Sequence, residues 1–304
     1  MEKLLIIADI HDKFVRAQAI IDSVPHDRCI LLGDYFDSHG GTTENARNTA
    51  TWLKEKVLYN SKIVPLIGNH CINYIWQNNP HYRCSGFTTE KAIAINDVLT
   101  EDDKNQLKFF HVEQGFAFTH AGVSNQIWKK LVQRYPENRD KPKLEYFSEV
   151  LNAAIAEAID LTNHGSAAEL FGAGWDRNGF QRDGGITWVD WNNLAPIVGI
   201  NQIVGHSAHR VPHILVQRDG GGCTRGSILE YYEHEDLVRR TNEALVVPIK
   251  QKKILSTSYN LDTGLSHYAV ITDGVVDIYE YFNRLNLKDV KSSNIPDSSM
   301  NNLS

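Results

Sequence analysis

Cysteine is scarce in this sequence, and the few cysteines lie far apart. None of them forms a Cys-x-x-Cys pair, which excludes a zinc knuckle and gives no framework of disulfides. Free thiols are typical of a reducing compartment, so we expect a cytoplasmic protein. Cys84 has no neighbouring base in the sequence, and we expect it to be a small buried residue rather than a nucleophile. The four are Cys29, Cys71, Cys84 and Cys223.

The sequence also lacks a long apolar run and an excess of positive charge. No stretch approaches the ~18 apolar residues of a membrane span. The run before Asp9 is too short for the core of a signal peptide. Lys and Arg number 31 against 37 Asp and Glu, so the net charge is −6. We therefore expect no membrane partner and no general affinity for nucleic acid; a phosphorylated ligand would need a local site.

The overall composition is that of an ordinary globular protein. The chain has 304 residues, of which 42% are hydrophobic, enough for one large core or two modest ones. It shows no internal repeat and no clear linker, so we expect a single domain over residues 1–284. Residues 285–304 are rich in Ser and Asn and read as a flexible tail.

Short, unalternated apolar runs predict strands that are buried on both faces. Helical patterns near 13–24 and 43–58 separate the first three runs, which indicates a parallel sheet covered by helices. A longer amphipathic helix is predicted over 143–162. Beyond His209 the pattern is one of strands and hairpins, with a turn at Asp273-Gly274. The runs themselves are 4–8, 29–33, 63–68, 116–120 and 202–206.

Polar side chains end or directly follow every one of these five runs. In an open α/β sheet, ligands bind beyond the carboxyl ends of the strands. A single Asp, Asn or His there has ordinary explanations, such as a helix cap, a turn or a structural histidine. Together they indicate one site, and their oxygen and imidazole groups suit manganese, iron or zinc. They are Asp9 and His11, Asp34 and Asp37, Asn69 and His70, His120, and His206.

Local spacing supports parts of this site. In an extended segment, residues two apart point the same way, so Asp9 and His11 could reach one ion. Gly33 permits a close backbone approach just before Asp34. His209 follows His206 by three residues, and whether it is a further ligand stays open.

Five segments resemble, in order, the motifs of the calcineurin-like metallophosphoesterases, and within them the phosphoprotein phosphatase branch. They are DIH at 9–11, GDYFD at 33–37, GNHC at 68–71, THAG at 119–122 and VGHS at 204–207. LDTG at 261–264 is similar to a strand and turn near the end of that family, so the likeness covers nearly the whole chain. The resemblance implies a two-sheet α/β/β/α sandwich with a metal site at the carboxyl ends of its strands.

The resemblance also implies roles for the residues. Two divalent metal ions are expected, manganese foremost, with iron or zinc as alternatives. His70 would protonate the leaving oxygen, and Asp37 would hold His70. The first ion would be bound by Asp9 and His11, both ions by Asp34, and the second ion by Asn69, His120 and His206.

This chain departs from the phosphatase pattern in places. Ser38-His39 stands where that branch has Arg-Gly, and Cys71 stands where it has an acid. A phosphate-clamping arginine must therefore come from elsewhere. Arg177 and Arg182 are the substrate-binding candidates, although a solvated loop arginine is an equal alternative for either, and Arg83 is a weaker third. The segment 213–256 exceeds the usual connection of the family and is a possible insertion over the site.

The expected activity is hydrolysis of phosphomonoesters by a hydroxide that bridges the two metals. The substrate would be a phosphoprotein or a small phosphorylated metabolite. An alternative is a phosphodiesterase or a dinucleoside polyphosphate hydrolase with the same dinuclear core. A non-catalytic binding module is disfavoured, because such a module usually lacks a ligand and none of the six is missing here.

Overall fold

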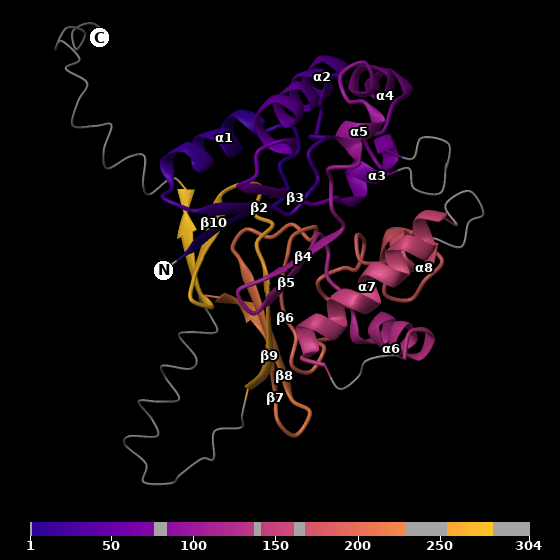
Figure 1. Cartoon of the computed structure of the whole chain (residues 1–304), viewed down its shortest axis with the longest axis vertical. Coiled ribbons are helices and arrows are strands. Elements are labelled where there is room, and N and C mark those ends of the chain that lie inside the picture. The colour runs from indigo at the N-terminus through magenta and orange to yellow at the C-terminus, as the bar shows by residue number, and fades with distance from the viewer. Residues whose placement is uncertain (1, 76–83, 137–140, 161–167, 229–253, 282–304) are drawn as a thin grey trace, which may run out of the picture.

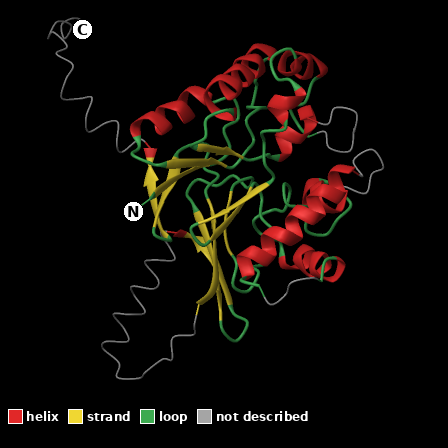
Figure 2. Ribbon diagram, in the orientation of Figure 1, coloured by secondary structure: helices red, strands yellow, loops and turns green. Residues whose placement is uncertain are grey.

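The computed structural model describes residues 2–75, 84–136, 141–160, 168–228 and 254–281. These residues form two β-sheets stacked on each other, with helices on their outer faces (Figure 1 and Figure 2). The α/β sandwich predicted from the sequence is thereby confirmed. No helix in the described ranges is both long and apolar enough to cross a membrane.

The first sheet has the strand order β11-β10-β1-β2-β3. Its parallel core coincides with the first three apolar runs: β1 (Lys3–Ile7), β2 (Arg28–Leu31) and β3 (Ile63–Pro65). Two helical crossovers make that parallel pairing possible. The first is α1 (Phe14–Ser23), and the second is α2 (Thr43–Trp52), which continues as the π-helix η1 (Leu53–Leu58).

A hairpin completes the first sheet on the other side of β1. It consists of β10 (His267–Thr272) and β11 (Val275–Glu280), which pair antiparallel. The predicted turn residues Asp273 and Gly274 have φ of 52° and 78°. A two-residue type I′ turn requires positive φ at both positions, and Asp-Gly supplies it.

The second sheet has the order β4-β5-β6-β9-β7-β8. The fourth and fifth apolar runs lie beside each other as parallel strands β5 (Phe116–Thr119) and β6 (Asn201–Val204). The described part of the segment 213–256 belongs to this sheet as strands, whereas residues 229–253 lie outside the described residues. The remaining strands are β4 (Phe110–Glu113), β7 (His213–Arg218), β8 (Cys223–Ser227) and β9 (Ile254–Asn260).

Alternate side chains of one strand face two different cores, which explains why the runs are apolar throughout. Leu5 and Ile7 pack in the cluster shared with the helices. Leu4 and Ile6 pack in the cluster between the sheets, against Phe118 among others. Packing on both faces therefore fixes the orientation of each strand, and with it the position of the residues that follow the strand.

The remaining helices lie beside the two sheets. The predicted helix at 143–162 is present as α7 (Lys143–Asp160), and it lies with α6 and α8 beside the second sheet (Figure 1). Residues 285–304, the expected tail, lie outside the described residues. The other helices are α3 (Asn69–Ile75), α4 (Thr89–Asn96), α5 (Glu101–Lys104), α6 (Asn125–Arg134), α8 (Ala168–Phe171) and the 3-10 helix η4 (Trp175–Arg177).

Candidate metal centre

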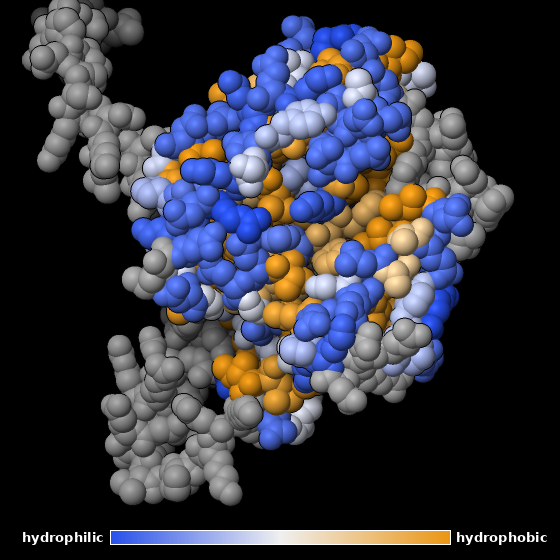
Figure 3. All heavy atoms as spheres, viewed as in Figure 1, coloured by the Kyte–Doolittle hydropathy of each residue, from blue (hydrophilic) through white to orange (hydrophobic). Residues whose placement is uncertain are grey.

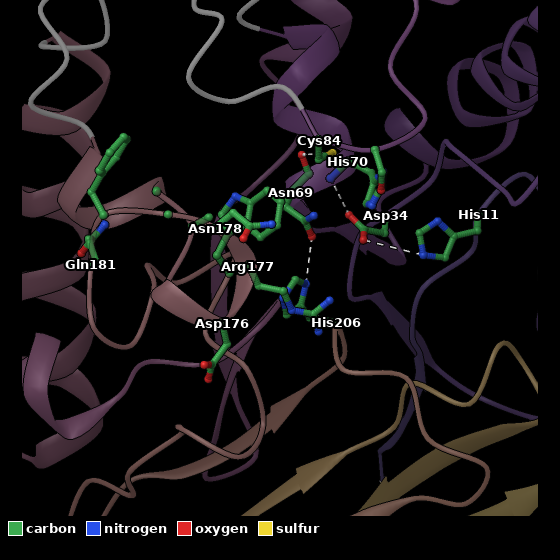
Figure 4. A pocket seen from close by; sticks show the side chains of 16 residues that line it. His11, Asp34, Asn69, His70, Cys84, Asp176, Arg177, Asn178, Gln181 and His206 are labelled. Carbon is green, nitrogen blue, oxygen red and sulfur yellow. Dashed lines mark hydrogen bonds and ion pairs between the residues drawn. The ribbon is translucent and has the colours of Figure 1, made fainter.

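The segments that follow β1, β2, β3 and β6 line a pocket of about 510 Å³, and His120 at the end of β5 lies against Asn69 beneath it. Figure 4 shows Asp34 between His11 and His70, with Asn69 and His206 on the other side. The opposite wall is the segment 172–181, which contains η4. Seen from outside, the face over α1 and α2 is mainly hydrophilic, and apolar surface is exposed between these helices and α6–α8 (Figure 3).

One ligand cluster consists of Asp34, His120 and His206. The Asn69 Oδ1 atom lies 2.9 Å from both His120 Nε2 and His206 Nδ1. His120 Nδ1 donates to the carbonyl oxygen of Leu32 at 2.9 Å, so in the neutral imidazole Nε2 carries a lone pair. That lone pair faces the amide oxygen and, at 3.3 Å, the Asp34 Oδ2 atom. Acceptors facing one another have no hydrogen to share, and a cation between them satisfies all of them.

A second ligand cluster consists of Asp9, His11 and Asp34, whose ligand atoms lie within 4.8 Å of one another. His11 Nδ1 donates to the Phe36 carbonyl oxygen at 2.9 Å, which again leaves Nε2 as the acceptor. That Nε2 atom is 3.8 Å from Asp34 Oδ2. Asp34 therefore belongs to both clusters, as a carboxylate that bridges two cations would.

The backbone at these residues corrects one step of the sequence reasoning. Asp9 and His11 do not converge by strand alternation, because β1 ends at Ile7 and both residues have positive φ, 40° and 42°. Asp34, Asp37 and His206 are also left-handed, with φ of 48°, 66° and 70°. Such conformations cost about 1–3 kcal/mol each for residues other than glycine, so the packed sheets must hold these turns in place.

Two motif glycines are required by close contacts with the carboxylates. A Cβ atom on Gly68 would lie 2.0 Å from Asp34 Oδ1. A Cβ atom on Gly205 would lie 2.0 Å from Asp9 Oδ2. Neither distance is compatible with a side chain, so the glycine of GNH and the glycine of VGH are there to admit Asp34 and Asp9.

The electrostatics of the site fit bound cations. Burial raises the pKa of Asp9 well above its usual range, and the charges of Asp262 and Asp34 raise it further. Burial likewise raises the pKa of Asp262. Burial also opposes ionisation of Asp34, but positive charge on His120 and the other imidazoles outweighs it and lowers the pKa of Asp34; a cation between neutral rings and the carboxylate would supply the same charge. Divalent cations would neutralise the carboxylates and bind His206 through Nδ1, the ring nitrogen that faces the Asn69 Oδ1 atom.

His70 lies at the rim of the two clusters. Its Nδ1 atom is 3.1 Å from Asp37 Oδ2, and its backbone N–H donates to Asp34 Oδ1 at 2.9 Å. Burial lowers the pKa of His70, but the Asp34 charge and the hydrogen bond with Asp37 raise it overall to about 11. The predicted pair of an imidazole and a carboxylate that orients it is therefore brought together.

Of the two candidate arginines, the structure brings only Arg177 to the pocket. Arg177 lines the pocket wall, and its Nη2 atom is 2.9 Å from Asp190 Oδ2. Arg182 is not among the lining residues; its side chain is 71% exposed and lies beside Asp183. Arg83 lies outside the described residues.

Other residues differ from what the sequence led us to expect. Cys84 is only half-buried and lines the pocket, with Sγ within 4.8 Å of ligand atoms of Asp37 and His70. His209 stacks on His213 with ring centroids 3.8 Å apart and belongs to neither ligand cluster. Asp262 is a buried carboxylate beside Asp9 that the sequence reasoning missed, although the LDTG segment that carries it was recognised.

A two-sheet α/β sandwich with carboxylate, amide and imidazole groups at its facing strand ends defines the class of metal-binding phosphoesterases. The family model described as calcineurin-like phosphoesterase matches residues 2–210. The chain belongs to the calcineurin-like phosphoesterase family. None of the curated proteins compared with this chain matches it significantly.

Several solved structures are similar to this chain at low identity. A cold-active protein-tyrosine phosphatase of a psychrophilic Shewanella species is 13% identical, with a TM-score of 0.46, over 92% of this chain and 78% of that one. A metallophosphoesterase from Sphaerobacter thermophilus is 13% identical, with a TM-score of 0.37, over 98% and 96%. A protein serine/threonine phosphatase from Saccharomyces cerevisiae is 10% identical, with a TM-score of 0.37, over 97% and 82%.

Proposed function

We propose that this protein hydrolyses phosphomonoesters and that its site holds two divalent cations, manganese foremost. The observation that carries the proposal is that Asp34 belongs to both ligand clusters. Asp9 and His11 would complete one cation site with it. Asn69, His120 and His206 would complete the other. When bound, such ions supply the positive charge that activates water and stabilises the phosphoryl oxygens.

The side chains of this chain handle the leaving group. His70 donates a proton to the departing oxygen, a contribution of about 10²–10⁴-fold when the acid is well placed. Asp37 accepts from His70 Nδ1, which fixes the ring and leaves Nε2 as the atom that transfers the proton. His70 and Arg177 both line the pocket, so both can reach one bound phosphate ester.

Arg177 binds the phosphate in this proposal. A guanidinium forms two parallel hydrogen bonds to phosphate oxygens. The Asp190 carboxylate, 2.9 Å from Arg177 Nη2, holds the side chain at the pocket wall. Substrates would be phosphoproteins or small phosphorylated metabolites, bound by this local positive group rather than by the acidic surface as a whole.

The test is a comparison of a monoester with a diester. The purified chain is stripped of metal, supplied with Mn²⁺, and assayed with p-nitrophenyl phosphate and bis-p-nitrophenyl phosphate. We expect metal-dependent hydrolysis of the monoester and a large loss in Asp34→Asn, whereas Asp22→Asn, a change at an exposed helix carboxylate, retains activity. Preference for the diester would establish the phosphodiesterase alternative instead. Hydrolysis of neither ester by the metal-loaded chain would point to a binding module.

A further inference from the structure

Lys91 occupies a position where a lysine is unfavourable. It lies in the first turn of α4, where its backbone N–H donates to the side chain of the N-cap residue Thr88 at 3.2 Å. The positive end of the helix dipole disfavours a cation in that turn. The side chain is also buried, since Lys91 is only 5% exposed. A buried lysine at a helix N-terminus must therefore gain a compensating interaction.

That interaction is with the carboxylate behind the candidate acid. Lys91 Nζ lies 3.1 Å from Asp37 Oδ1 and donates to the Gly86 carbonyl oxygen at 2.9 Å. Tyr74 OH donates to the same Asp37 oxygen at 2.5 Å. The backbone is tightly fitted here, because a Cβ atom on Gly86 would lie 2.9 Å from the Asp37 Cβ atom.

The two oxygens of Asp37 thus have separate partners. Oδ1 accepts from Lys91 and Tyr74, and Oδ2 faces His70 Nδ1 at 3.1 Å. Rotation of the carboxylate would break all three interactions. The Tyr74 ring in turn contacts Phe36 edge-on and stacks with Phe87, with ring centroids 5.3 Å apart in both pairs. A continuous series of contacts therefore links the first turn of α4, through Asp37, to the His70 imidazole.

We propose that Lys91 and Tyr74 are positioning residues that fix the Asp37 carboxylate, so that His70 presents Nε2 to the leaving oxygen. The inference rests on the proposed phosphomonoesterase function. Neither residue lines the pocket, and neither belongs to a ligand cluster. Without Lys91 the carboxylate loses one buried positive charge and one of the two donors that orient Oδ1. The imidazole then loses its fixed orientation, although the residues of both ligand clusters stay in place.

The dependence on the leaving group distinguishes positioning from a general structural role. A good leaving group such as p-nitrophenolate departs without a proton, whereas the phenolate of phenyl phosphate needs one. We expect Lys91→Met to lower kcat for phenyl phosphate at least about 10-fold more than kcat for p-nitrophenyl phosphate, within the 10²–10⁴-fold range of acid catalysis. We expect KM and the metal content to stay close to those of the parent protein.

A double-mutant cycle gives the second readout. If Lys91 acts through His70, Lys91→Met has little further effect on kcat in a His70→Gln background. Lys104→Met is the matched control, since Lys104 is also a buried lysine, with its Nζ 2.6 Å from Glu101 Oε1 on α5. Tyr74→Phe removes only the hydroxyl group and is the variant to use if Lys91→Met does not fold; the same preferential loss on phenyl phosphate is expected for it.

Two results would overturn the inference while leaving the proposed function intact. One is an equal loss on both esters in Lys91→Met or Tyr74→Phe. The other is a loss that is as large in the His70→Gln background as in the parent. A parent protein that hydrolyses neither ester would instead overturn the proposed function itself, and the positioning role with it.

Discussion

The molecule contains two kinds of buried carboxylate, one at the strand ends and one on α5. Asp103, on α5, is fully satisfied by the chain: Oδ1 accepts from Tyr59 OH at 2.6 Å, and Oδ2 accepts from Lys54 Nζ at 2.8 Å. Asp9 and Asp34 instead face each other, with Asp262 close by. All three carboxylates are almost fully buried, but only Asp103 has enough donors.

The pKa shifts of Asp103 and Asp9 differ in sign for that reason. Burial alone would raise the pKa of Asp103, but hydrogen bonds from Lys54, Tyr59 and Thr100 outweigh it and hold the pKa below its usual range. Burial and neighbouring carboxylates raise the pKa of Asp9. A buried acid that the protein satisfies stabilises the fold, whereas a buried acid opposite another acid requires a cation from outside.

The largest expected effect is on activity. Asp34→Asn should lower kcat/KM for p-nitrophenyl phosphate by about 10²–10³-fold or more, because it weakens both cation sites at once. Asp103→Asn should retain the activity of the parent per folded molecule. The measurement is steady-state kinetics with Mn²⁺ on protein whose folded fraction is known. Similar losses of activity in Asp34→Asn and Asp103→Asn would contradict the claim that the two carboxylates have different roles.

The next effect is stabilisation by metal. A ligand present at a hundred times its Kd stabilises the native state by about 2.7 kcal/mol. Saturating Mn²⁺ should therefore raise the Tm of the parent and of Asp103→Asn by several degrees, but not that of Asp34→Asn. Thermal scans with Mn²⁺ and with a chelator check this. An equal rise in Asp34→Asn would place the cations elsewhere.

Opposite effects on stability are expected in the metal-free chain. Asp103→Asn should lower the free energy of unfolding by about 1–3 kcal/mol, because Lys54 loses a charged partner. Asp9→Asn should be neutral or stabilising, because it removes a carboxylate that burial and Asp262 disfavour. Urea denaturation in the presence of a chelator measures both. A larger destabilisation by Asp9→Asn than by Asp103→Asn would contradict the comparison.

The smallest expected effect is on the stability of the fold at acidic pH. A carboxyl group whose pKa is lowered by folding contributes stability above its unfolded pKa of about 3.9, and that contribution is lost as the pH falls toward the folded pKa. The difference in unfolding free energy between parent and Asp103→Asn should therefore be constant from pH 7 to about pH 5 and shrink below about pH 4. If the difference in unfolding free energy instead grew as the pH fell, the ionised form of Asp103 would not be the form that stabilises the fold.

The comparison also explains what the sequence could predict. The candidate ligands lie at the ends of buried strands, so the apolar runs of the sequence predicted where Asp9, Asp34 and the others would meet. The left-handed turns at Asp9 and His11 were not predictable from alternation, because the strand ends before they begin. Lys91 and Tyr74 carry no local pattern at all. They reach Asp37 from helices far along the chain, and only the packed fold brings them together.

The count of bound metal ions tests the account most directly. After loading with Mn²⁺ and removal of free ions, elemental analysis should find two ions per chain in the parent and in Asp103→Asn, and fewer in Asp34→Asn. One ion or none in the saturated parent would contradict the claim that the Asp34 carboxylate joins two cation sites.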